Sequence, residues 1–144
     1  MRTFALRNGD LVLTGDRYGM VEGAALLQQQ LSLALTEPFG SDRFHPRWGS
    51  VLNQWIGGTI SDETISFVQA EVLRVVKNYV VAQNAALTQR TSGMKRPNVS
   101  LNEIISEVTD VTVRPSGDSL VVRVGLRTAA RQEFAVMATT QRSA

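Results

Sequence analysis

The chain has 144 residues, of which 43% are hydrophobic and 19% are charged, and its formal net charge is +2 at pH 7. This length and balance predict a single globular domain, residues 1–144, with enough chain to bury a core. A charge this small does not indicate a nucleic-acid-binding surface, which needs a concentrated basic stripe. There is no apolar run of about eighteen residues and no basic-then-apolar leader, so we expect no membrane span and folding in the cytoplasm.

The sequence contains no cysteine and a single histidine, His45. A disulfide framework, a thiol nucleophile and every zinc site that uses sulfur are therefore excluded. One imidazole cannot build a multi-histidine metal site, and no Gly-x-Ser-x-Gly elbow surrounds a serine. We therefore predict no metal and no cofactor.

Three local signals precede the first proline of the chain. Short apolar runs on either side of Asn8-Gly9 predict a β-hairpin over residues 4–13, because Asn-Gly favours a tight hairpin turn. Residues 15–19 then read as a turn. Apolar residues recur at three- and four-residue spacing from Val21 to Leu35, which predicts an amphipathic helix. Three successive glutamines, 28–30, fall mostly on its outer side.

A longer helix is predicted over residues 61–88. It begins with a serine followed by Asp62-Glu63, and acidic residues suit the positive end of the helix dipole. A short helix is predicted at 50–56, ended by two glycines, and a helical turn at 100–103, where Ser and Glu have the spacing of a capping box. Residues 91–98, which include two adjacent cations, are predicted to form a loop.

From Val108 the hydrophobic period changes to two. The alternation on either side of a turn at Pro115–Asp118 predicts an antiparallel hairpin with one buried face and one wet face. A further strand is predicted over residues 134–138. The elements together predict an α+β fold, in which a small antiparallel sheet, made of the C-terminal hairpin plus the N-terminal hairpin, packs with one long helix and two or three shorter helices.

The loop over residues 36–49 concentrates prolines, glycines, aromatic residues, acids, arginines and the histidine of the chain. Pro38 and Pro46 fix their own φ angles and bias the residues before them away from helical geometry. We therefore predict a shaped loop that loses little conformational freedom when it binds a partner.

Three interpretations of this loop are open on the residues alone. Glu37 and Asp42 could form a pair of glycosidase carboxylates, with His45 as a base. The charges could instead only hold the turn. In the third interpretation, Arg43 presents its fork of donors to carboxylates or carbonyls of another chain.

The order of residues in this region resembles the motif of the baseplate wedge family of contractile phage tails. These are the sheath-initiator proteins that are also labelled lysozyme-like. The residues that carry the resemblance are Leu35, Thr36, Gly40, Asp42, Arg43, Pro46, Trp48, Gly49, Ser50 and Leu52. The chain departs from the family pattern in two ways: Asp42 stands where glutamate is usual, and Ser41 is inserted before it. Glu37 is therefore a second candidate for the acidic role.

The resemblance implies a structural protein without catalytic residues, which links the core of the baseplate wedge to the first ring of sheath and initiates sheath assembly. The residues implied to grip the core bundle of the larger wedge subunits are Glu37, Pro38, Asp42, Arg43, Pro46, Trp48 and Gly49. The residues implied to pair with the tail sheath protein are Gln132, Phe134, Val136 and Ala138, in an arm over residues 128–144 that depends on its partner. Without the resemblance, the same segment reads as a simple edge strand.

The resemblance also implies six copies per particle, in the tail baseplate of a virion assembled in the host cytoplasm, with hub or tube proteins as further neighbours. Two alternatives are kept. One is a peptidoglycan-cleaving, lysozyme-like enzyme that uses Glu37 or Asp42. The other is the equivalent baseplate subunit of a type VI secretion system.

Overall fold

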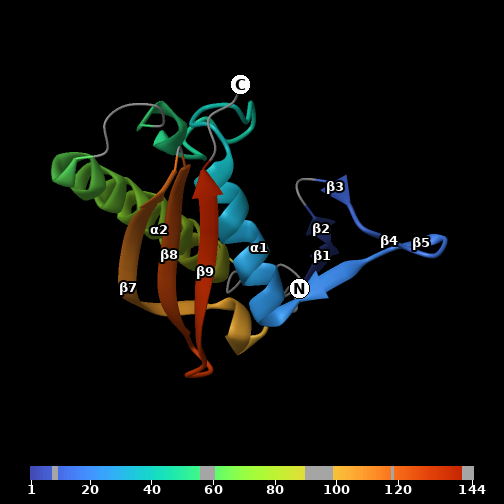
Figure 1. Cartoon of the computed structure of the whole chain (residues 1–144). Helices are drawn as coiled ribbons and strands as arrows, with labels where there is room; N and C mark the ends of the chain where they lie inside the picture. Colours follow the sequence, from blue (N-terminus) through green and yellow to red (C-terminus); the bar gives the residue numbers. More distant parts are fainter. Residues whose placement is uncertain (8–9, 56–60, 90–98, 118, 141–144) are drawn as a thin grey trace.

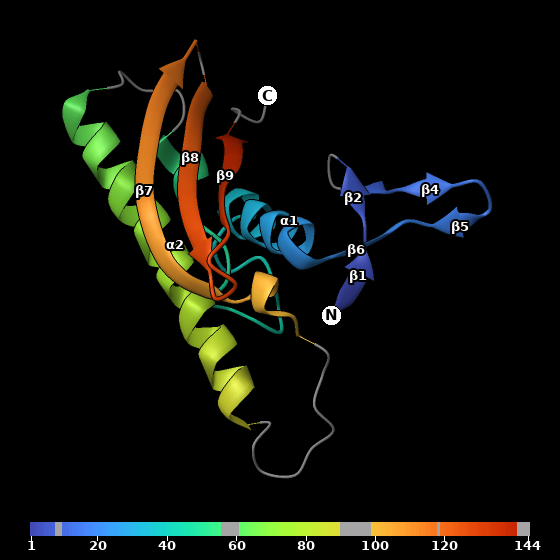
Figure 2. The ribbon, with the colours of Figure 1, turned by 90° about the horizontal axis from the view of Figure 1, so that it is seen from below.

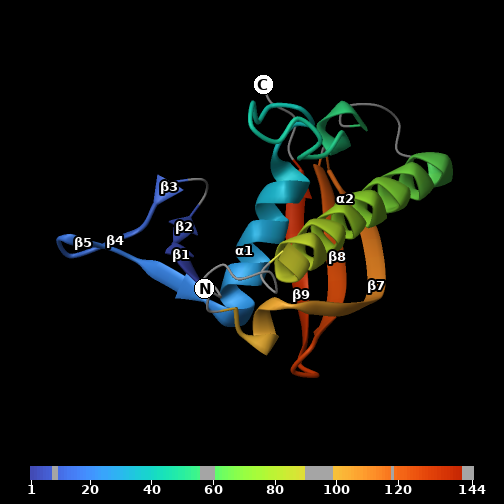
Figure 3. The same ribbon diagram turned by 180° about the vertical axis from the view of Figure 1, so that it is seen from behind.

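A three-stranded antiparallel sheet forms one layer of the protein, and two α-helices cover one face of it (Figures 1 and 3). The computed structural model describes residues 1–7, 10–55, 61–89, 99–117 and 119–140. The strands are β7 (Ile105–Ser116), β8 (Ser119–Thr128) and β9 (Glu133–Thr140), and the helices are α1 (Gly23–Thr36) and α2 (Asp62–Gln89). The predicted α+β class is confirmed.

The hydrophobic core lies between the helices and the sheet. Each helix buries residues three or four apart, and the central strand β8 buries every second residue. The most deeply buried side chains are Leu27, Leu31 and Leu35 of α1, Val68, Val72 and Val76 of α2, and Leu120, Val122, Val124 and Leu126 of β8. Burial of each such side chain contributes about 1.5–3 kcal/mol, so this packing holds the three elements together.

The helices match the sequence in part. α2 confirms the long helix predicted over residues 61–88. α1 begins two residues after Val21, because Val21 pairs in a strand and Gly23, at φ 65°, turns the chain into the helix. The expected two or three shorter helices are one α-helix and two 3-10 turns, η1 (Leu52–Trp55) and η3 (Leu101–Glu103), which are too short for α-helical hydrogen bonding. The predicted glycine stop at 57–58 and loop at 91–98 lie outside the described residues.

The sheet has the order β7-β8-β9 and confirms the period-two pattern. Ser116 pairs with Ser119, so Pro115 belongs to β7 and not to the turn, where Gly117 has φ 59°. The register of β7 on β8 shifts twice, whereas β9 pairs with β8 without interruption from Glu133 to Thr140. β7 and β9 are the two edges of the sheet.

Residues 1–22 form a separate β unit beside α1, which we call the N-terminal trefoil (Figure 2). It consists of three short antiparallel pairs: β1 (Arg2–Phe4) with β6 (Met20–Glu22), β2 (Leu6–Arg7) with β3 (Asp10–Leu11), and β4 (Leu13–Thr14) with β5 (Arg17–Tyr18). The predicted hairpin is confirmed in part by the β2–β3 pair, because Phe4 and Leu13 at its ends pair with Met20 and Tyr18 instead. Its Asn8-Gly9 turn lies outside the described residues. The prediction that this hairpin joins the C-terminal sheet is wrong.

The strands of the trefoil pair with one another, and its three arms meet at a closed triangle of backbone hydrogen bonds. Ala5 N donates to Gly19 O at 2.8 Å, Val12 N donates to Ala5 O at 3.0 Å, and Gly19 N donates to Val12 O at 2.8 Å. The segment predicted as a turn at 15–19 is therefore shorter, since Arg17 and Tyr18 already belong to β5. The strands of the trefoil are two or three residues long and bond to one another, so they do not extend the main sheet.

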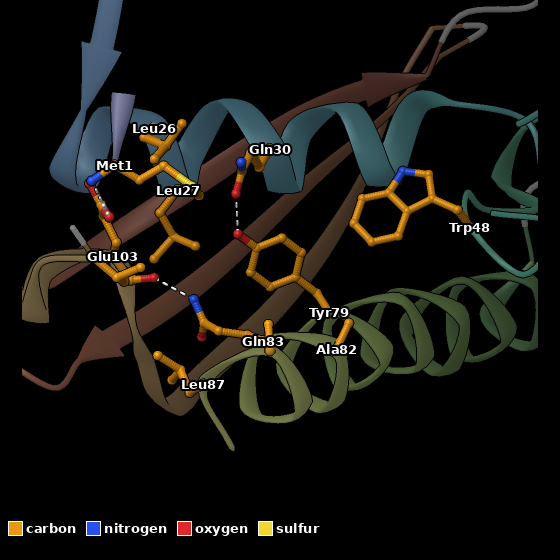
Figure 4. A pocket seen from close by; sticks show the side chains of 12 residues that line it. Met1, Leu26, Leu27, Gln30, Trp48, Tyr79, Ala82, Gln83, Leu87 and Glu103 are labelled. Atoms are coloured by element: carbon orange, nitrogen blue, oxygen red, sulfur yellow. Dashed lines mark hydrogen bonds and ion pairs between the residues drawn. The ribbon is translucent and has the colours of Figure 1, made fainter. Parts of the chain in front are cut away.

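The three successive glutamines of α1 bind three different elements. Gln28 Nε2 donates to Ala135 O of β9 at 3.2 Å, and the Gln29 amide bonds both Phe4 O and the N–H of Leu6 in the trefoil, each at 2.9 Å. Gln30 accepts a hydrogen bond from the Tyr79 hydroxyl of α2 (Figure 4). Successive residues of a helix are rotated by about 100°, which sends the three side chains in three directions. The glutamines therefore connect α1 to β9, to the trefoil and to α2, and do not only form the outer face of the helix.

Candidate interaction surfaces

The loop that follows α1 is closed at its neck. Ser50 N donates to Glu37 O at 2.8 Å, and Phe39 N donates to Ser50 O at 2.9 Å. Gly49 has φ 94°, and a Cβ placed there would lie 2.7 Å from Pro38 O, so the two sides of the neck approach more closely than any other residue permits. The result is a compact Ω-loop with its ends together.

Two residues of α2 that the sequence analysis did not single out hold this loop. Glu71 Oε1 accepts the N–H of Val51 at 2.9 Å, and Arg74 donates to Gly49 O at 3.1 Å while lying 5.2 Å above the ring centre of Phe39. Burial by itself raises the pKa of Glu71, but the bonds from Arg74 and Val51 outweigh it and the net pKa is lowered. Their signal in the sequence is only an acid and a base three residues apart, which is common on exposed helices.

Trp48 and Gly49 of the predicted binding loop face the body of the protein. Gly49 is buried, and the Trp48 ring packs against the core with its centre 6.0 Å from that of Tyr79. Both residues therefore support the loop and leave its contact surface to the residues of the tip.

The tip of the loop is held by Asp42. Its carboxylate accepts the N–H of Phe44 at 2.8 Å and lies 2.8 Å from His45 Nδ1, and the bond with His45, followed by that from Phe44, lowers the pKa of Asp42. A glycosidase general acid needs the opposite shift. Asp42 is therefore ionised, and its hydrogen bonds hold the turn at the tip of the loop.

The exposed part of the tip is cationic and aromatic. The Phe44 side chain is 89% exposed, and the sequence analysis did not select it. Arg43 and Arg47 are also exposed, and within the described part of the chain neither forms an ion pair. An aromatic ring among unpaired arginines has the composition of a protein-binding hot spot.

Three of the four side chains predicted to pair with sheath face the core, and the fourth, Gln132, is exposed. Val136 and Ala138 are 2% and 3% exposed, and Phe134 packs against the core. Gln132 precedes the strand, and its carbonyl accepts the N–H of Thr128 at 2.9 Å. Any pairing by this segment must therefore use its backbone.

The backbone of β9 has a free side. The Thr128–Gln132 bond and the regular register fix which residues bond to β8, and they leave the backbone groups of Ala135, Met137 and Thr139 pointing away from the sheet. The bond from Gln28 to Ala135 O lies on this free side. β9 therefore offers alternate N–H and C=O groups to a partner.

A groove of about 770 Å³ runs along this free side, which we call the β9 groove. The residues that line it come from β9, from α1, which lies beside β9 (Figure 1), and from β2 of the trefoil. Its lining is Leu6, Ala25, Gln28, Gln29, Ser32, Leu33, Thr36, Ala135, Val136, Met137, Ala138 and Thr139. None of these described lining residues is charged, which suits an extended, uncharged segment.

The other edge strand, β7, is protected. Its register shifts twice, and it carries Glu107 and Asp110, which pair with Arg127 at 2.7 Å and Arg123 at 2.8 Å. Bulges and charges are the usual means of preventing strand addition to a sheet edge. β9 has neither from Phe134 to Thr140, so it is the open edge of this sheet.

A smaller pocket of about 160 Å³ separates α1 from α2 (Figure 4). At one end the Glu103 carboxylate, 4% exposed, accepts the N–H of Gly23 at 2.9 Å and lies 3.1 Å from the Met1 amino group. Gln83 donates to Glu103 O and accepts from Ile105 N. These polar groups fasten the start of α1 to η3 and β7, which is a structural role.

The described residues contain neither a metal-binding cluster nor a membrane-spanning helix. No cluster of three acidic or imidazole side chains with the geometry for a metal ion occurs in the described ranges. Neither helix, over the part of the chain that the structure describes, combines the length and apolar character needed to cross a lipid bilayer.

Comparison with known proteins establishes the fold. No family model matches the chain, and no curated protein matches its sequence. Among solved structures, the chain is similar to a Geobacter sulfurreducens protein that is named provisionally as a tail lysozyme, with a TM-score of 0.59 over 94% of this chain and 98% of the other. The two chains share the same fold. At 14% identity, the likeness does not transfer an activity.

The closed neck of the loop predicts a difference between two glycine substitutions. Gly49 and Gly15 both have positive φ, 94° and 67°, so alanine is strained at either position. Only at Gly49 would the new Cβ also meet backbone, at 2.7–2.9 Å; nothing lies within 4 Å at Gly15. Gly49→Ala should therefore lower the free energy of unfolding by about 1–3 kcal/mol more than Gly15→Ala in urea titrations. Equal losses would show that the neck is not tightly closed.

Proposed function

We propose that this protein is a structural component of a contractile tail or related injection machine, located in the baseplate, and that it has no enzymatic role. In this proposal it joins the wedge subunits to the first ring of sheath. The observation that carries the proposal is the open, uncharged edge of β9 beside a groove without charged lining residues. The shared fold with a protein that is named as a tail lysozyme supports the association with tails.

The β9 edge is proposed to accept an extended segment of the sheath protein. That segment would bond to the outward backbone groups of Ala135, Met137 and Thr139 and lie over α1, which is the geometry of strand addition. Each backbone hydrogen bond contributes about 0.5–1.5 kcal/mol net, so several are needed together. Gln28 satisfies Ala135 O in the free protein and would release it to the incoming strand.

The loop tip is proposed to bind the larger wedge subunits. Arg43 and Arg47 would meet carboxylates or helix-terminal carbonyls there, and Phe44 would enter an apolar socket. The closed neck and the Asp42 contacts fix the tip before binding, so little conformational entropy is lost. The resemblance implies that Asp42 itself grips the wedge subunits, whereas we propose that Asp42 supports the tip from within.

Met137→Pro tests the β9 edge. Met137 N–H points away from β8, so proline removes one outward donor and adds a ring at the edge while the β8–β9 bonds remain. In cells that produce the complete particle, we expect the variant to enter baseplates and sheath growth to fall sharply, as counted by electron microscopy. Met137→Ala retains the N–H and should assemble normally. Normal sheath on Met137→Pro baseplates would exclude strand addition at β9.

Arg43→Ala tests the tip at an earlier step. The side chain makes no ion pair within the described residues, so its loss should leave the folding free energy within about 0.5 kcal/mol of the native value. We expect the variant to be missing from purified baseplates when measured by quantitative mass spectrometry. Arg43→Lys keeps the charge but loses the bidentate fork and should be intermediate. Native incorporation of Arg43→Ala would remove the tip from the interface.

The competing function is peptidoglycan cleavage, which the name of the structural neighbour favours. Under our proposal, the native chain does not solubilise labelled peptidoglycan above the level of a Glu37→Gln/Asp42→Asn double variant. Turnover by the native chain that is lost in the double variant would establish the enzyme instead. The type VI baseplate alternative uses the same two surfaces and differs only in the assembly that takes up the protein.

A further inference from the structure

The face of the three-stranded sheet that points away from the helices carries charged side chains (Figure 1). In β8 the even-numbered residues from 120 to 128 are buried, so the odd-numbered ones point to this outer face. Their cross-strand partners in β7 and β9 point the same way. Two arginines of β8, Arg127 and Arg123, lie on the outer face, and their surroundings differ.

Arg127 is neutralised from both sides. It lies 2.7 Å from Glu107 of β7 and 2.6 Å from Glu133 of β9. The two glutamates are its cross-strand partners, one in each neighbouring strand. One guanidinium on this face therefore holds two carboxylates, which its five N–H donors permit.

Arg123 has an acid on one side only, within the described residues. Its Nη1 donates to Asp110 Oδ2 of β7 at 2.8 Å. Asp110 can lie across β8 because Gly125 has no side chain: a Cβ there would be 2.0 Å from Asp110 Oδ1. On the β9 side the partner of Arg123 is Met137, which has no charge. The Nε and Nη2 groups of Arg123 therefore make no hydrogen bond within the described part of the chain.

A hollow of about 470 Å³ adjoins Arg123 and Met137 on the outer face, and we call it the arginine hollow. Arg114 of β7 lines it as well, is exposed, and forms no ion pair among the described residues. Thr112 and Ser116 add two hydroxyl-bearing side chains to the lining. None of its described lining residues is acidic, so the hollow offers two guanidinium groups to an anion.

The surroundings of the hollow favour a carboxylate as that anion. Guanidinium groups bind carboxylate and phosphate alike, but Arg127 already shows a second carboxylate bound on this face. Asp110 stays beside Arg123 and repels a doubly charged phosphate more strongly than a singly charged carboxylate. Val121 and Met137 give the lining an apolar part, which suits the methylene groups and neighbours of an acidic side chain.

We propose that the arginine hollow binds the carboxylate of an aspartate or glutamate in an exposed segment of another protein. The carboxylate lies between Arg114 and Arg123, and it takes beside Arg123 the place that Glu133 has beside Arg127. Asp110 is a positioning residue, since it holds Arg123 from the far side. The proposal does not depend on the function proposed above, because the ligand contacts the outer face and neither the backbone edge of β9 nor the loop tip.

NMR titration of the isotope-labelled full chain tests the hollow. The probe is a pentapeptide with blocked ends and two glutamates, and its control has glutamines in their place. The glutamate peptide should shift the amide signals of Arg114 and Arg123, and the glutamine peptide should not. Arg114→Gln and Arg123→Gln should each weaken this binding about threefold or more. Arg17→Gln, at another exposed arginine on a strand, and Arg43→Gln in the loop tip should leave it unchanged.

A substitution in β9 supplies the missing acid from within. Met137→Glu should pair with Arg123, as Glu133 pairs with Arg127, and should exclude the peptide from the hollow. Met137→Gln has the same length without the charge and should bind the peptide as the native chain does.

Four results would overturn the proposal. They are a glutamate peptide that shifts no signal of the hollow, equal binding of the glutamine peptide, native affinity in both arginine variants, and native affinity in Met137→Glu. Inorganic phosphate at the same ionic strength should not displace the peptide. Displacement by phosphate would assign the hollow to a phosphate group and would also overturn the proposal.

Discussion

The structure depends on how α1 is enclosed. Its leucines are buried against the sheet and α2. Its three successive glutamines, 28–30, are each hydrogen-bonded to a neighbouring element. Gln29 and Gln30 are half-buried, and a half-buried amide without a partner would cost about 1–3 kcal/mol, so these two glutamines specify that the trefoil and α2 lie on their sides of α1. The trefoil, the open edge of β9 and α2 take their positions from this one helix. The loop neck is tied to it as well, through the bond from Ser50 Oγ to Leu35 O.

The two edge strands of the sheet differ in how they are protected against unwanted pairing with other chains. β7 has shifts of register and paired acids, whereas β9 is regular and uncharged along most of its length. An open edge invites aggregation, and within the described ranges the side chain seen to bond to it is that of Gln28. An edge that is left open beside one that is closed is the expected design for a site of strand addition.

The β9 groove and the loop tip differ in the chemistry that they offer. The groove offers backbone groups and uncharged side chains, whereas the tip offers cations and an aromatic ring. These differences are the reason why we propose an extended segment as the partner of the groove and an acidic protein as the partner of the tip. Both proposed partners are macromolecules, in keeping with the structural role that we propose.

The sequence by itself determined the features that depend on neighbouring residues: α2 from its helical period, the β7–β8 hairpin from alternation, the β2–β3 pair, and the shaped loop from its prolines and glycines. Tertiary structure decided the rest, because burial and strand pairing join residues far apart in the chain. It placed Val21 in a strand, separated the trefoil from the main sheet and turned Val136 and Ala138 inward. It also brought Glu71 and Arg74 to the loop neck and left Phe44 uncovered, and no local pattern distinguishes such side chains from ordinary surface residues.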